Sequence, residues 1–156
     1  MQIAGSGRFV FIAQWVAAVV LPAFFFIGRE FIGGKVGWLG VIGIVYGVVI
    51  ILFLLIPPIL TLFDRDVRKA KATRRAYDIA SFVLWGGFLL GGISVPDAGD
   101  SGHLPTAITT WTGGAIGDEA STVIFTVAAA IILLAYLAVF VIAIVGIVRS
   151  RRTVAA

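Results

Sequence analysis

The chain has 156 residues, of which 60% are hydrophobic and only 13% are charged, with a formal net charge of +4. An apolar fraction this far above the roughly 45–50% of soluble domains excludes an ordinary water-soluble fold and indicates a membrane protein. The absence of cysteine excludes disulfides, thiolate metal sites and cysteine nucleophiles.

Four long apolar runs divide the chain, each near the ~20 residues that a helix needs to cross a bilayer. They are roughly Phe9–Ile27, Trp38–Leu62, Ile79–Val95 and Thr122–Val148. The pattern predicts an all-α integral membrane protein with one domain over residues 1–156, folded as an antiparallel bundle of four transmembrane helices. The first run has no small-x-small cleavage site after it, so we expect an uncleaved span rather than a signal peptide.

Basic residues are divided unevenly between the connections. Ten of the 12 Lys and Arg residues precede the first run, join the second to the third, or follow the fourth. The positive-inside rule therefore predicts that both termini and the connection 63–78 are cytoplasmic. The excess of Arg over Lys indicates a bacterial source, and hence the bacterial cytoplasmic membrane.

Six cations gather in the connection 63–78, and we expect them to contact anionic lipid at the cytoplasmic face. They are Arg65, Arg68, Lys69, Lys71, Arg74 and Arg75. Because no aromatic residues are interleaved with them, nucleic acid is not expected as a partner. The connection has no Gly or Pro, so we expect it to continue the two flanking helices into the cytoplasm.

Small residues recur at helical spacing in three of the runs. The expected helix-packing positions are Ala13, Ala17, Gly40, Gly43, Gly47, Gly87 and Gly91. In lipid, close backbone approach has to drive association between helices, and small residues permit that approach. These positions therefore predict packing within one bundle or, alternatively, a face that docks a second copy or another membrane protein.

The second run ends on Pro57-Pro58, and each proline removes an N–H that would bond the carbonyl four residues earlier. A carbonyl freed in hydrocarbon is costly unless another group donates to it. Gln14 and Trp85 are expected at a similar depth, and both carry N–H donors. We therefore predict a kinked helix whose freed carbonyls are bonded by Gln14 or Trp85.

The connection 96–121 is the longest and the only acidic one, and it holds the single histidine. Its candidate cation ligands are Asp97, Asp100 and His103, with Asp118 and Glu119 able to return nearby. Their spacing matches no known calcium loop, so we assign no metal site and no cofactor, and a solvated loop is the alternative. The β-prone stretch 107–112 before Gly113-Gly114 predicts a hairpin turn there.

No constellation of residues identifies a catalytic site, so the leading prediction is a non-enzymatic protein. It would act by helix association as an accessory subunit, assembly factor or scaffold, in a homo-oligomer or a larger membrane complex. One alternative is a small oligomeric transporter or channel, with Gln14, Tyr46 and Tyr136 as polar contacts past the kink. The other is a membrane enzyme whose external site would use the acidic residues and His103 of the connection 96–121.

Overall fold

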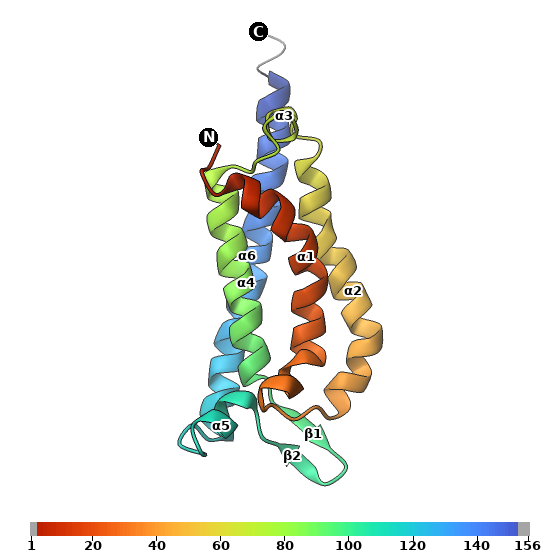
Figure 1. Cartoon of the computed structure of the whole chain (residues 1–156), viewed down its shortest axis with the longest axis vertical. Helices are drawn as coiled ribbons and strands as arrows, with labels where there is room; N and C mark the ends of the chain where they lie inside the picture. The colour runs from red at the N-terminus through yellow and green to blue at the C-terminus, as the bar shows by residue number, and fades with distance from the viewer. Residues whose placement is uncertain (1–2, 153–156) are drawn as a thin grey trace.

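The computed structural model of the chain describes residues 3–152 and is 77% helical. Four helices are long and apolar enough to cross a membrane, and they run along the long axis of the molecule (Figure 1). They are α1 (Gly7–Phe26), α2 (Trp38–Thr61), α4 (Arg75–Ser94) and α6 (Asp118–Arg152). The prediction of an all-α chain with four helices of membrane length is confirmed.

Short elements lie at the two ends of the long helices (Figure 1). We call one end the hairpin end and the other, where α1 begins and α6 finishes, the terminal end. The hairpin end holds η1 (Gly28–Ile32), β1 (Asp97–Gly99), β2 (Gly102–Leu104) and α5 (Ala107–Trp111). The terminal end holds α3 (Arg65–Ala70).

The long helices form an incompletely closed ring. The most extensive packing joins α4 to α6, α1 packs on both α4 and α2, and α2 contacts α6 least. Leu54, Leu84 and Val139 belong to the buried cluster at the centre. The opposite sides of α2 and α6 are apolar and exposed, as expected for helices that face lipid rather than water.

The residues before α1 pair with the linker between α3 and α4. Ile3 and Arg74 form an isolated antiparallel bridge, and the N–H of Ala4 donates to the carbonyl of Thr73 at 3.1 Å. Gly7 lies directly against this linker, since a Cβ there would stand 2.5 Å from the Thr73 carbonyl oxygen. A larger residue at Gly7 would separate α1 from the start of α4.

The connection between α2 and α4 extends only one of the two helices. Helix α4 begins at Arg75, four residues before the predicted span, whereas α2 ends at Thr61, so the predicted extension of α2 is wrong. Asp64 caps a separate short helix, accepting from the N–H groups of Asp66 and Val67. That helix ends at Lys71, whose φ of 48° is left-handed. A side-chain cap at one end and a left-handed residue at the other isolate α3 from both neighbours.

The hairpin lies earlier in the chain than the sequence predicted. Strands β1 and β2 pair over Asp97–Gly99 and Gly102–Leu104, whereas the stretch 107–112 is mostly the helix α5. Thr106 caps this helix, because its hydroxyl accepts from the N–H of Thr109 at 3.2 Å. The cap outweighs the β-propensity of the stretch, and the following two glycines form a left-handed turn instead.

Candidate functional site

A buried ion pair joins two remote connections at the hairpin end. Arg29, in η1, donates through Nη2 to the carboxylate of Asp97, and the two side chains are 2% and 4% exposed. Arg29 also donates through Nη1 to the carbonyl of Val95 at 3.2 Å. One side chain therefore holds the α1–α2 connection against the end of α4.

The Asp97 carboxylate is surrounded by donors. It accepts the backbone N–H groups of Gly37 at 2.7 Å, Leu39 at 3.0 Å and Ala98 at 2.8 Å. Burial acts to raise the pKa of Asp97, but these N–H groups and the Arg29 charge outweigh it, so the pKa lies below its ordinary value. Burial is also the main influence on Arg29 and lowers its pKa, against the opposing effect of Asp97.

The predicted cation ligands are only partly brought together. Asp97, His103 and Asp118 line one cleft of about 80 Å³, while Asp100 and Glu119 are exposed. The described part of the chain contains no group of three or more His, Asp or Glu placed to hold a metal ion. Asp97 serves the ion pair, which explains its position better than a role in binding cations.

A second ion-pair cluster lies at the terminal end. Arg74, which precedes α4, donates through Nε and Nη2 to Asp64 at 2.9 and 3.1 Å, and through Nη2 to Asp66 at 2.9 Å. Hydrogen bonding to Asp64 raises the pKa of Arg74 above its ordinary value. Gly146 of α6 admits the pair, because a Cβ there would stand 2.6 Å from the Asp64 carboxylate.

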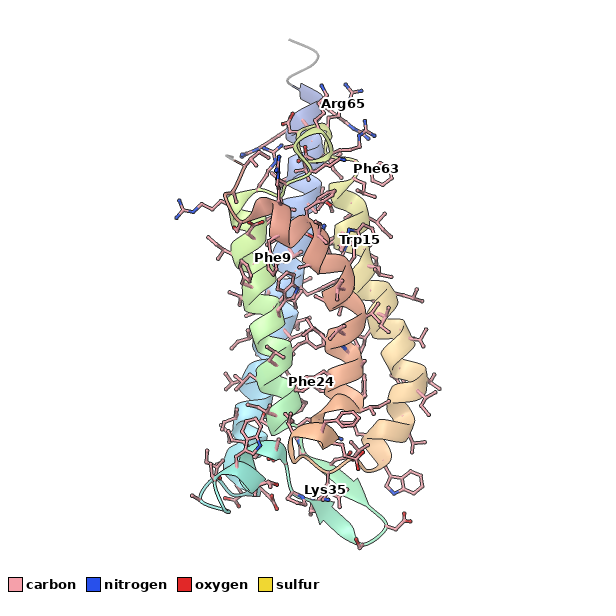
Figure 2. The ribbon with its side chains drawn as sticks, viewed as in Figure 1. Phe9, Trp15, Phe24, Lys35, Phe63 and Arg65 are labelled. Carbon is pink, nitrogen blue, oxygen red and sulfur yellow. The ribbon has the colours of Figure 1, made fainter. Side chains whose placement is uncertain are left out.

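The predicted lipid-contact set is wrong at one position. Arg74 is only 8% exposed, because it is held in the cluster with Asp64 and Asp66. The five other members are exposed: Arg65, Arg68, Lys69, Lys71 and Arg75. Figure 2 shows Arg65 among many nitrogen-tipped side chains at the terminal end, with Lys35 at the opposite end.

Asp78 is a buried acid at the start of α4. Its carboxylate accepts the hydroxyls of Ser6 and Thr73. It is 2% exposed and lies in the first turn of α4, where the helix dipole favours a negative charge. Asp78 therefore helps to attach the segment before α1 to α4.

A polar pair lies between α1 and α4. The hydroxyl of Tyr77 donates to Oε1 of Gln14 at 2.7 Å, and Nε2 of Gln14 donates to the carbonyl of Phe11 at 3.1 Å. Both side chains are buried. Gln14 thus contributes its acceptor to Tyr77 and its donor to its own helix.

The segment of α2 before Pro57 is bonded from α6, so the predicted donors are wrong for Phe53. The carbonyl of Phe53, which lacks its helical partner because of Pro57, accepts the hydroxyl of Tyr136 at 2.9 Å. Gln14 and Trp85 do lie near the prolines, where they help to line a cavity of about 20 Å³. Counting residues along each helix predicted correctly that Gln14 and Trp85 lie at the depth of the prolines. Only the folded structure shows that α6 is the helix that faces Phe53.

Several predicted packing glycines hold aromatic rings of the same chain. A Cβ at Gly43 would overlap the ring of Phe26, and Gly47 contacts that ring from the next turn of α2. On α4, a Cβ at Gly87 would stand 3.0 Å from Ile132 of α6. These close approaches lie between helices of one chain.

The other packing positions are less uniform. Gly40 is buried beside Val36, and Ala13 and Ala17 are half-buried. A Cβ at Gly91 would stand 3.3 Å from the ring of Phe25.

The sequence did not predict a packing role for Gly92, because it lies outside the four-residue spacing that joins Gly87 and Gly91. A Cβ at Gly92 would stand 2.6 Å from the ring of Phe24, which is labelled in Figure 2. The spacing of small residues alone does not show which aromatic ring a glycine will meet.

The outward face of α2 is exposed and carries one polar side chain. In the most apolar stretch of α2, 22% of residues are buried, against 44% for α4. Tyr46 projects from this face and is 60% exposed. Among residues 3–152, its hydroxyl has no hydrogen-bond partner.

Comparison with protein-family models, curated proteins and solved structures finds no match for this chain.

Proposed function

We propose that the chain is an integral membrane protein that crosses a bacterial cytoplasmic membrane four times and acts by association, without catalysing a reaction. In this proposal the terminal end is cytoplasmic. Four helices of membrane length and the concentration of exposed cations beside α3 support it. Each exposed cation near the membrane surface would contribute about 1 kcal/mol of attraction to anionic lipid.

The observation that carries the association is Tyr46 on the exposed face of α2. Tyr46 lies about 12 Å along the helix axis from Trp38, the first residue of α2. In a membrane this depth is inside the hydrocarbon region and too deep for the interfacial aromatic belt. A phenol hydroxyl gains from a partner there, because lipid tails offer no hydrogen bond. The partner we propose is a helix of another membrane protein that presents a hydrogen-bond acceptor at this depth.

The arrangement of polar groups gives the other two functions less support. The transport alternative needs Gln14, Tyr46 and Tyr136 along one path. Gln14 bonds within the α1–α4 interface, Tyr136 bonds to α2, and Tyr46 projects outward. The enzyme alternative relies on Asp97, whose carboxylate is engaged by Arg29 and three backbone N–H groups.

Photocrosslinking in native membranes tests the association. A photoreactive residue at Val49, one turn beyond Tyr46 on the exposed face, should form a discrete protein adduct. Replacing Tyr46 with Phe should weaken that adduct about threefold, the equivalent of the ~0.6 kcal/mol average for a hydrogen bond between membrane helices. A photoreactive residue at exposed Val141 of α6 is the control and should form no such adduct.

Two results would count against the proposal. Labelling of lipid alone from Val49 would show that this face has no protein partner. An adduct of equal strength with Tyr46 and with Tyr46→Phe would show that the hydroxyl does not contribute. Gly43→Leu is a poor test, because the side chain would collide with Phe26 and disturb the fold before any complex.

A further inference from the structure

An apolar groove opens on the side of the molecule between α2 and α6, with a volume of about 340 Å³. Its α2 wall includes Ile50 and Phe53, and its floor is formed by Phe25 of α1 and Phe88 of α4. Its lining is almost wholly carbon, so it offers neither water nor a polar ligand a set of hydrogen bonds.

The groove follows α6 for about three turns. Its α6 wall is a single stripe at helical spacing, made by residues 125, 129, 132, 133 and 136. At about 1.5 Å per residue the stripe extends about 17 Å along the helix. This shape suits a linear hydrocarbon chain better than a single inserted side chain.

The fold maintains the groove in two ways. The hydrogen bond from Tyr136 to Phe53 holds α6 to α2 beside one end, and the two helices diverge toward the hairpin end (Figure 1). The floor is a cluster of rings, with Phe25 lying 6.3 Å from Phe88 and 6.2 Å from Phe125 between ring centroids. Such ring contacts resist collapse of the floor into the groove.

We propose that this groove binds one acyl chain of a bilayer phospholipid, from the leaflet on the hairpin side. The inference rests on the membrane location proposed above, since there the groove opens directly toward hydrocarbon. Phe25 lies in the last turn of α1 at the hairpin end, which places the floor within reach of that leaflet. Binding would come from many dispersion contacts, because moving a chain from lipid to an apolar groove gains no hydrophobic energy.

Photolabelling with a phospholipid that carries a diazirine in the middle of one acyl chain tests the proposal. The unaltered chain, reconstituted in vesicles of that lipid and a bulk phospholipid, should yield adducts concentrated on Phe125–Tyr136 and the α2 wall. Ala129→Phe, which fills the groove, should reduce those adducts about fivefold, equivalent to ~1 kcal/mol. Ala130→Phe, on the exposed surface beside the groove, is the matched control and should leave them unchanged.

Adducts spread evenly over the exposed faces of α2 and α6 would overturn the proposal, as would equal labelling of Ala129→Phe and Ala130→Phe. The absence of lipid adducts from the groove, with adducts formed elsewhere on α2 and α6, would likewise overturn the proposal. The map of the unaltered chain decides the question even if Ala129→Phe does not fold. Resistance of the chain to alkaline extraction from the vesicles tests membrane insertion separately, so failure of the groove and failure of the proposed location are distinguishable.

Discussion

At the scale of single residues, the buried charges lie near the ends of the long helices and join separate elements of the fold. Arg29 and Asp97 are 68 residues apart, while Arg74 holds Asp64 across α3. Burying such charges costs several kcal/mol each, which the partner has to offset. Removing one partner should therefore be much more damaging than removing an exposed charge nearby.

Asp97→Asn should lower the free energy of unfolding by about 3–5 kcal/mol, because Arg29 would stay buried without its counter-charge. Unfolding in mixed micelles, followed by circular dichroism as dodecyl sulfate is added, measures the change. Asp100→Asn is the control, an exposed acid on the same hairpin, and should shift stability by less than about 0.5 kcal/mol. Equal stability of the two variants would contradict the structural role of the ion pair.

The lowered pKa of Asp97 also predicts a pH dependence. In the unfolded chain an Asp side chain has a pKa of about 3.9, so the stabilisation that Asp97 contributes is complete above that pH. It is lost as the pH falls through the lower pKa of the folded state, because the carboxylate must then be protonated. Between about pH 4 and pH 2 the natural chain should lose stability more steeply than Asp97→Asn. Parallel titrations of the two proteins would exclude this contribution.

At the scale of elements, the hydrogen bond that Pro57 removes from α2 is replaced by a donor on another helix. The hydroxyl of Tyr136 replaces the N–H that Pro57 cannot supply to Phe53. The proline-containing part of α2 is thus coupled to the position of α6, and the bond contributes to α2–α6 packing where contact is otherwise sparse. Replacing Pro57 should therefore change how much Tyr136 contributes to the stability of the fold, and the reverse should also hold.

A double-mutant cycle tests this coupling. Tyr136→Phe alone should destabilise the chain by about 0.5–1.5 kcal/mol. With Pro57→Ala, residue 57 regains an N–H that can bond Phe53 within the helix, so Tyr136→Phe should then cost close to nothing. The same micelle titration measures all four proteins. A cost of Tyr136→Phe that does not depend on residue 57 would show that the hydroxyl does not repair the proline gap.

The long helices could be predicted from hydropathy because each is a local property of one run of residues. The partners of polar groups could not, since Arg29 meets Asp97 and Phe53 meets Tyr136 only after the helices are arranged. Small-residue spacing found Gly43 and Gly87 but not the ring or side chain that each contacts. Residues 107–112 were misassigned because the cap at Thr106 outweighs strand propensity in so short a segment.

At the scale of the whole molecule, the exposed cations gather at one end and the acidic hairpin connection lies at the other (Figure 2). This asymmetry supports one orientation of all four helices together, because basic residues near span ends remain on the cytoplasmic side. In the orientation proposed above, the start of α1 and the finish of α6 would both lie on that side.

The absence of native cysteine allows this orientation to be measured by labelling. A cysteine at exposed Ser101, in the hairpin turn, should react with an impermeant maleimide added to intact cells or spheroplasts. A cysteine at exposed Gly5, before α1, should react only after the membrane is opened. Labelling of Gly5→Cys but not Ser101→Cys in intact cells would reverse the proposed orientation.

The span of the Arg29–Asp97 pair has a consequence for how the protein is made. At about 5–20 residues per second, a ribosome needs roughly 3–14 s to add the 68 residues that separate the two side chains. Throughout that interval Arg29 lacks the Asp97 carboxylate that it meets in the folded chain, so burying the guanidinium then would forgo the counter-charge that offsets its burial. The mature arrangement at this end therefore becomes available only after the third long helix has left the ribosome.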